Sequence, residues 1–391
     1  MSLGRVNTDG TRAVLLLLGI NAMAVCGLWY DDLLGATAGS FIADVRNSGQ
    51  NSVDRGAFTQ NYYGEILESE RAEEGQERMM RNLNIGRNRD RNPATFIGNS
   101  SAARIPGTFL PWEFIPNAST TFHELPLEIN QWGMRDRRDY TKEKPDGTFR
   151  IAMVGGSTVM GTGVLEKQCF ANLLEVKLNE GLAGQYYDRY EVLNFSMGGY
   201  HLLERLYLVE EKVGEFDPDL ILVSGTDKDL TIQPERLARK LKKRQDIHFP
   251  FLRRLVKEAG VDRRVDQKER MERKLHPFME ELLMRTVREL SNYSKERNVE
   301  MAIFLLRRVG GKKLNADLVR TLEVMRREDL TVLPVFEAYE GTEPMALWIG
   351  PYTDPDLADP HPNIEGHRRI ADNLYELLLA DPTIGEMLRA E

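Results

Sequence analysis

Cysteine is scarce in this chain, which holds only Cys26 and Cys169 among 391 residues. Two cysteines so far apart do not suggest a disulfide framework or a cysteine-rich metal site. Positive charge is also in deficit, because 52 Lys and Arg stand against 60 Asp and Glu. That balance argues against a general nucleic-acid-binding surface, so no nucleic acid is expected as a partner. Internal repeats and low-complexity tracts are lacking as well, and the length allows about two or three domains.

Long apolar runs are missing except for one near the amino terminus. Residues 13–30, AVLLLLGINAMAVCGLWY, carry no charge and are just long enough to cross a bilayer as a helix. Arg5 and Arg12 precede this run and two aspartates follow it, which predicts a cytoplasmic amino terminus. The sequence therefore predicts a cytoplasmic tail over 1–12, a single transmembrane anchor over 13–30, and a main domain in the periplasm or outside the cell.

Two other interpretations of the apolar run stay open. A cleavable signal peptide is one, because Ala36-Thr37-Ala38 is typical of a cleavage site. A buried helix of a soluble protein is the other, and the apolarity on all sides of the run makes it the weakest. Both membrane-related interpretations export the rest of the chain.

The chain after the anchor divides into three parts. Residues 31–104 are polar and charged, and predict a stalk or accessory helical region. Residues 105–148 are richer in proline, aromatic and turn residues, which favours a small cap that contains β-strands. From Phe149 onward, short apolar segments alternate with amphipathic helical patterns.

The alternation over 149–391 predicts a parallel sheet covered by helices on both faces, in a flavodoxin-like three-layer α/β/α arrangement. The expected strands cover 150–154, 191–195, 220–224, 301–306 and 331–336. The expected helices cover 168–179, 201–213, 316–327 and 367–380. One segment, 234–297, is longer than a crossover between parallel strands requires and predicts an inserted, charged helical pair.

Part of this insertion is strongly basic. From Glu235 to Lys274 the chain has 15 Lys or Arg against 7 Asp or Glu. We favour a solvated helix surface, and a face toward anionic lipid headgroups or an acidic polymer is the alternative.

The first expected strand ends in a glycine-rich turn. Residues 151–157 read IAMVGGS, so an apolar strand runs into Gly155, Gly156 and Ser157. No lysine lies between residues 149 and 164, which excludes a phosphate-binding P-loop, and the glycine spacing does not fit a dinucleotide fingerprint. Two interpretations remain: a nucleophilic serine at the carboxyl end of a parallel strand, or an ordinary turn in which Ser157 caps the helix.

Three further motifs follow strand ends or precede the last helix. The second strand leads to Gly199, the third to Asp227, and the last helix is preceded by His361 between two prolines. Because the carboxyl ends of parallel strands share one edge of a sheet, we expect these residues to meet there. Acyl transfer needs such a set: a hydroxyl nucleophile, an imidazole, a carboxylate and amide donors for the oxyanion.

These motifs resemble the signature blocks of the SGNH/GDSL hydrolase superfamily. The matching residues are Gly155-Gly156-Ser157, Gly199, Gly225-Thr226-Asp227 and Asp359-Pro360-His361. The stretch INQWGMRDRRDYTKEKPDGTFRIAMVGGSTVMGTGV also resembles a membrane-tethered bacterial branch of this superfamily. The likeness runs from about Ile105 to Leu379 and implies the SGNH hydrolase fold for 149–391.

The resemblance implies a role for each matching residue. Ser157 would be the nucleophile, His361 the general base, and Asp359 the carboxylate that orients the imidazole. The backbone N–H groups of Ser157 and Gly199 would donate hydrogen bonds to the oxyanion. No metal and no organic cofactor is implied.

Three positions depart from the family pattern. Gly156 stands where the family usually has aspartate. Asp359 lies two residues before the histidine instead of three, with Asp356 as the fallback. Asp227 replaces an asparagine that donates to the oxyanion, whereas an ionised carboxylate only accepts hydrogen bonds. Asn194 is the candidate for a replacement donor.

The function predicted from these features is a membrane-anchored, extracytoplasmic serine ester hydrolase or O-acyl (acetyl) transferase. Its substrate would be an ester on a glycan or a lipid, and membrane proteins are candidate partners. The alternative, motivated by Asp227 and the anchor, is a weak or inactive SGNH-fold subunit that serves as a binding or scaffold component of a membrane assembly.

Overall fold

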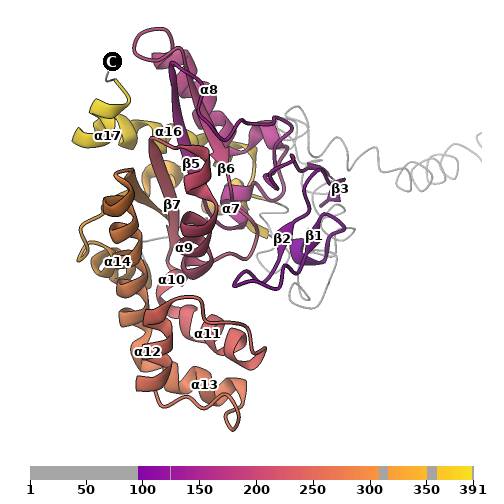
Figure 1. The fold of residues 1–391 in the computed structure, drawn as a ribbon. Coiled ribbons are helices and arrows are strands. Elements are labelled where there is room, and N and C mark those ends of the chain that lie inside the picture. The colour runs from indigo at the N-terminus through magenta and orange to yellow at the C-terminus, as the bar shows by residue number, and fades with distance from the viewer. Residues whose placement is uncertain (1–95, 124, 308–315, 350–358, 390–391) are drawn as a thin grey trace, which may run out of the picture. The chain divides into compact units, whose positions relative to one another are not determined.

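The computed structural model describes residues 96–123, 125–307, 316–349 and 359–389 (Figure 1). The predicted tail, anchor and nearly all of the stalk lie outside the described residues. Within these ranges, no helix is both long enough and apolar enough to cross a bilayer.

A five-stranded parallel sheet forms the centre of the fold. In spatial order its strands are β6 (Arg189–Asn194), β5 (Thr148–Val154), β7 (Leu220–Thr226), β8 (Glu300–Leu306) and β9 (Thr331–Val335). Every neighbouring pair is parallel. The order along the chain is thus 2-1-3-4-5, which is the flavodoxin-like order. The predicted parallel sheet is confirmed, and each strand begins and ends within two residues of its expected bounds.

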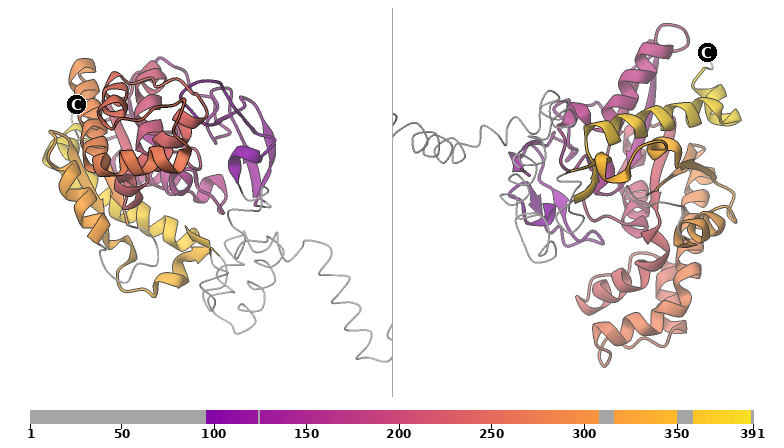
Figure 2. Two further views of the ribbon diagram at one scale, coloured as in Figure 1. Left: turned by 90° about the horizontal axis from the view of Figure 1, so that it is seen from below. Right: turned by 180° about the vertical axis from the view of Figure 1, so that it is seen from behind.

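Helices cover both faces of the sheet (Figure 1 and Figure 2). One hydrophobic cluster joins the sheet to α8 (Phe170–Leu182), α16 (Ile364–Ala380) and α17 (Pro382–Met387). The other joins it to α9 (Leu202–Glu211), α14 (Met279–Arg297) and α15 (Ala316–Met325). All seven residues of β5 are buried, as expected for a strand that lies between two helical layers.

Three helices between β7 and α14 extend away from the sheet (Figure 1). After the short α10 (Lys228–Thr231) come α11 (Gln233–Lys242), α12 (Pro250–Glu258) and α13 (Lys268–Leu275). The predicted inserted pair over 234–297 is therefore wrong. The segment holds α11, α12 and α13, which we call the arm, and then α14. α14 packs on the sheet as the crossover helix. Pro250 is the first residue of α12, and Pro277 lies in the turn between α13 and α14, positions that a residue without an N–H group favours.

Short strands precede the sheet, in the region predicted as a small cap. β1 (Ala103–Arg104) pairs with β2 (Glu113–Phe114), and β3 (Ser119–Phe122) pairs with β4 (Leu125–Glu128), both antiparallel. Trp112 Nε1 donates to the Gly198 carbonyl at 2.9 Å, and the Tyr200 hydroxyl donates to the Trp112 carbonyl at 2.5 Å. These bonds attach the region to the loop after β6. The domain boundaries themselves stay a prediction.

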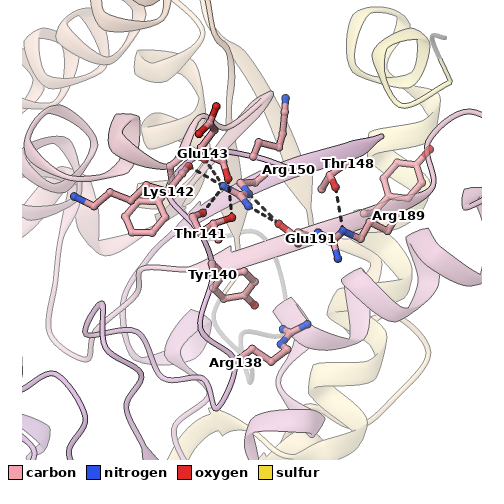
Figure 3. A network of polar contacts seen from close by, with 12 residues as sticks. Arg138, Tyr140, Thr141, Lys142, Glu143, Thr148, Arg150, Arg189 and Glu191 are labelled. Carbon is pink, nitrogen blue, oxygen red and sulfur yellow. Dashed lines mark hydrogen bonds and ion pairs between the residues drawn. The ribbon is translucent and has the colours of Figure 1, made fainter. Parts of the chain in front are cut away.

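A buried arginine ties β5 to the chain segments around it (Figure 3). Arg150 is 0% exposed, and its Nε and Nη2 donate to Glu191 Oε2 at 2.9 and 2.8 Å. Its Nη1 donates to the carbonyls of Thr141, Lys142 and Phe216 at 2.9, 3.0 and 2.7 Å. The guanidinium charge is thus balanced and its donors are used, which burial of a charge requires.

We expect Arg150→Met to lower the free energy of unfolding by about 3–5 kcal/mol, because it leaves a partly buried carboxylate and three carbonyls without their donor. Urea unfolding followed by circular dichroism measures this loss. Arg189 is the matched control, since it lies 3.2 Å from the same Glu191 but is 49% exposed. Arg189→Met should cost less than about 1 kcal/mol. Equal losses in the two variants would contradict this account of Arg150.

Candidate active site

The turn after β5 places Ser157 at the start of a short helix, α7 (Ser157–Met160). Gly155 makes the turn possible, because a Cβ there would lie 2.1 Å from Val159 Cγ2 and 2.8 Å from Ser224 Oγ. The helix N-cap is Gly156 and not the serine, so the interpretation of Ser157 as a capping residue is wrong. Its hydroxyl is left for another partner.

That partner is His361, which lies between Ser157 and Asp359. His361 Nε2 is 2.6 Å from Ser157 Oγ, and its Nδ1 is 2.6 Å from Asp359 Oδ1. Asp359 is 3% exposed and also accepts a hydrogen bond from the His361 backbone N–H at 3.0 Å. An ionised carboxylate only accepts, so Nδ1 carries the ring proton and Nε2 accepts from the serine hydroxyl.

The spacing between Asp359 and His361 has a structural reason. Both residues lie in β11 (Asp359–Pro362), which pairs antiparallel with β10 (Trp348–Ile349). Alternate residues of a strand point to the same side, so a carboxylate two positions before the histidine can bond its ring. The fallback residue Asp356 lies outside the described residues.

A pocket of about 390 Å³ opens beside this serine. Its lining includes Ser157 after β5, Gly199 after β6, Asp227 after β7, Arg307 after β8, and His361. The structure therefore brings together residues that follow the carboxyl ends of the neighbouring strands. In the part of the chain that the structure describes, no group of three His, Cys, Asp or Glu side chains is arranged to hold a metal ion.

The candidate oxyanion residues differ in where they lie. Gly199 lines the pocket with φ of +81°, and a Cβ there would lie 2.6 Å from Trp112 Cζ2, so only glycine fits. Asn194 is 4% exposed, and its Nδ2 donates to the Val159 carbonyl at 2.7 Å. The prediction of Asn194 as a replacement donor is wrong, because its amide supports the turn below the pocket.

Asp227, which stands where the sequence pattern calls for asparagine, lies at the pocket. It lines the pocket together with Ser157 and directly precedes α10. Asp227 is thus one of the residues around the pocket of Ser157, at the position where the superfamily that the motifs resemble has asparagine. An ionised carboxylate there provides no N–H for a developing negative charge.

Sequence reasoning missed a buried ion pair between Arg205 and Asp229 at the edge of the pocket. Asp229 is 0% exposed and accepts from Arg205 Nη1 at 2.9 Å and from the Thr226 N–H at 2.8 Å. Its second oxygen lies 3.5 Å from His201 Nδ1. Burial raises the pKa of Asp229, but the Arg205 charge and the His201 hydrogen bond lower it well below its ordinary value. His201 also lines the pocket.

Arg205 accounts for the glycine at position 156. Its Nη2 lies 3.2 Å from where a Cβ of Gly156 would be, and the Tyr200 carbonyl lies 3.1 Å from the same point. A side chain at 156 would therefore press against a buried arginine that is already paired with Asp229. The available signal was an arginine among the apolar residues of LLERLYLV.

Arg135 supports the other end of α7. It is 6% exposed, and its Nη1 donates to the Met160 carbonyl at 3.0 Å and to the Gly161 carbonyl. Its Nη2 donates to the Val164 carbonyl at 2.6 Å. Carbonyls at a helix end lack partners inside the helix, so these bonds fix the short helix that carries Ser157.

His367, the other histidine near the last motif, is a core residue. It lies in the first turn of α16 as expected, is 0% exposed, and its ring stacks on Phe170 at 5.7 Å. Its Nδ1 accepts from the Phe170 N–H at 3.2 Å. Burial lowers the pKa of His367 to about 3, and the charge of Arg135 acts in the same direction.

No protein-family model and no curated protein matches the chain. Among solved structures, TesA is 16% identical, with 59% of this chain and 97% of that chain covered and a TM-score of 0.36. Axe2, an acetylxylan esterase from Geobacillus stearothermophilus, is 14% identical over 59% of this chain and 93% of that chain, with a TM-score of 0.36. A member of the lipolytic protein G-D-S-L family from Veillonella parvula is 13% identical over 60% and 100%, with a TM-score of 0.35.

At these identities and TM-scores the matches carry no argument about an activity. The chemistry of the site has to be argued from its own geometry.

The neutral, buried His367 predicts a loss of stability in mild acid. Its folded-state pKa of about 3 lies below the unfolded value of about 6.5, so between these values the unfolded chain binds a proton that the folded chain does not. This contribution to stability is fully present above about pH 6.5 and is lost progressively as the pH falls toward 3.

We expect wild type to lose about 2 kcal/mol more than His367→Gln between pH 7 and pH 5, because glutamine keeps an acceptor for the Phe170 N–H but does not titrate. Urea unfolding at the two pH values gives both differences. The same pH dependence in the two proteins would show that this histidine is not held neutral.

Proposed function

We propose that this protein is a serine ester hydrolase or O-acyl transferase that acts through Ser157, His361 and Asp359. The observation that carries the proposal is the pair of 2.6 Å hydrogen bonds that runs from the carboxylate through the imidazole to the serine hydroxyl. A pocket of about 390 Å³ beside this hydroxyl gives an ester room to approach.

The reaction begins when Ser157 Oγ attacks the carbonyl carbon of the ester and its proton passes to His361 Nε2. Asp359 then stabilises the imidazolium through Nδ1. When the tetrahedral intermediate collapses, His361 returns the proton to the leaving alcohol and the acyl group stays on the serine oxygen. Water or an acceptor hydroxyl attacks this acyl-enzyme with His361 again as base, which yields the free acid or a new ester.

Backbone N–H groups of Ser157 and Gly199 are the proposed oxyanion donors, each of the kind worth about 3 kcal/mol in other enzymes. Asp227 supplies no third donor, and its negative charge opposes the charge that develops on the carbonyl oxygen. We therefore propose a slow esterase, or a transferase whose natural acceptor speeds the second step.

We also propose that residues 13–30 anchor the chain in a membrane, with the catalytic domain in the periplasm or outside the cell and an ester of a glycan or lipid as substrate. The uncharged run, with arginines before it and aspartates after it, supports the anchor and its direction. Membrane-protein partners belong to the same proposal.

A catalytically weak or inactive scaffold subunit is the second candidate function. The observation that favours it is the carboxylate of Asp227 in the pocket. The two candidates differ in whether Ser157 reacts with an ester at all.

Hydrolysis of 4-nitrophenyl acetate by purified protein separates the two candidates. We expect Ser157→Ala and His361→Gln each to lower kcat/KM at least about 10³-fold, because members of such a triad act as a unit. Ser119→Ala, which removes an exposed hydroxyl in β3, should keep wild-type activity. No hydrolysis by wild type, or hydrolysis that survives Ser157→Ala, would favour the scaffold.

Replacing Asp227 by asparagine should raise kcat about tenfold or more, because it removes a negative charge and restores an amide donor toward the oxyanion. Asp227→Ala removes only the charge and should give a smaller gain. Steady-state kinetics with the same ester measures both. A slower Asn variant would mean that the carboxylate assists the reaction and does not oppose it.

A further inference from the structure

We infer that the pocket beside Ser157 binds an anionic group of the substrate, a carboxylate or a phosphate, through Arg307. This inference rests on the proposed function and names the substrate class of the same site. The ester would therefore belong to an acidic molecule, for example an acylated uronic acid or an acylated sugar phosphate.

Arg307 is placed for this role by the sheet. It directly follows β8 and lines the same pocket as Ser157 and His361. Its guanidinium lies over the ring of Tyr339, 5.8 Å from the ring centroid. Tyr339 is 2% exposed, so the ring gives the guanidinium a fixed surface to stack on.

The donors of Arg307 are not used up within the described part of the protein. Its Nε is buried and has no hydrogen-bond partner, and no described carboxylate forms an ion pair with the side chain. Arg205, the other arginine of the pocket, also has a buried Nε without a partner, but its charge is paired with Asp229, with Nη1 2.9 Å from a carboxylate oxygen. A buried N–H without an acceptor is costly, and a bound anion would supply the acceptor.

The charges around the pocket favour an anion near Arg307. Lys228 is a further cation of the lining, and Asp227 is the one carboxylate among the described lining residues. Arg205 is already paired with Asp229, whereas Arg307 forms no ion pair with a carboxylate of the described residues. A carboxylate or phosphate fits the fork of a guanidinium better than a neutral hydroxyl does.

The sheet also limits where the anionic group lies on the substrate. β7 separates β5, which leads to Ser157, from β8, which leads to Arg307. Two strand spacings amount to about 10 Å between backbones, and the arginine side chain reaches across part of that distance. The anion would therefore be on the same sugar ring as the ester or on the next ring.

A matched set of acetate esters tests the inference: O-acetylated methyl glucuronide, O-acetylated glucose 6-phosphate and O-acetylated methyl glucoside. Acetate release gives kcat and KM for each. We expect wild type to prefer at least one anionic ester over the neutral one by about tenfold to a hundredfold in kcat/KM, mainly through KM. Comparison of the uronide ester with the phosphate ester shows which anion is preferred, and a preference for either supports the inference.

Arg307→Gln should bring the ratio between anionic and neutral esters close to one. Arg307→Lys keeps the charge but loses the fork, so its ratio should be intermediate. Arg254→Gln, in the exposed part of α12, is the matched control and should keep the wild-type ratio. A wild type without charge preference, or a preference that survives Arg307→Gln, would overturn the inference; the wild-type ratio decides even if the Gln variant does not fold.

Binding to Ser157→Ala separates this inference from the proposed function. Ligand-observed NMR with the same esters, which this variant does not turn over, should show tighter binding of an anionic ester, and the added Arg307→Gln should remove the difference. Charge-selective binding without hydrolysis by wild type would overturn the proposed function and support the anion site. Hydrolysis by wild type together with equal binding of charged and neutral esters would support the proposed function and overturn the anion site.

Discussion

The two hydrogen bonds of His361 join it to Ser157, 204 residues away in the chain, and to Asp359, two residues away, and the site exists only where both are made. Each bond depends on the backbone beneath it. The serine is held at a tight turn where β5 leaves the sheet, and the aspartate and histidine share one side of β11. The sheet supplies the common frame, because its parallel strands all deliver their carboxyl ends to the same edge.

Buried arginines hold this frame in place, and each donates several hydrogen bonds to the chain segments around it. Arg150 fixes the start of β5 through Glu191 and three carbonyls, and Arg135 fixes the carbonyls at the end of α7. Arg205 pairs with Asp229 beside the glycine that precedes the serine. Removing one partner of such a group leaves a buried polar atom without a hydrogen-bond partner, which is costly. Substitutions around the turn are therefore poorly tolerated. Arg307 differs because it lines the pocket beside Ser157 and forms no ion pair with a described carboxylate, which is why we assign it to a ligand.

The sequence predicted the sheet well because a strand buried on both faces leaves an apolar run that is visible locally. It also predicted the meeting of Ser157 and His361, although through motifs and topology and not through any local signal. The arm was mispredicted because helices as short as α12 and α13 are separated by turns whose geometry depends on packing. Asn194 was misplaced, since whether an amide faces a pocket or closes a turn depends on contacts with Val159, far along the chain. The pairing of Arg205 with Asp229 was missed for the same reason.

The central claim is that His361 activates the hydroxyl of Ser157. Its most direct test is the rate and place of phosphonylation by a fluorophosphonate, followed by peptide mass spectrometry. The account predicts one adduct, on the peptide that contains Ser157, formed at least about 10²-fold more slowly when His361 is replaced by glutamine. An adduct on another residue, or a rate at Ser157 that the loss of the imidazole leaves unchanged, would contradict it.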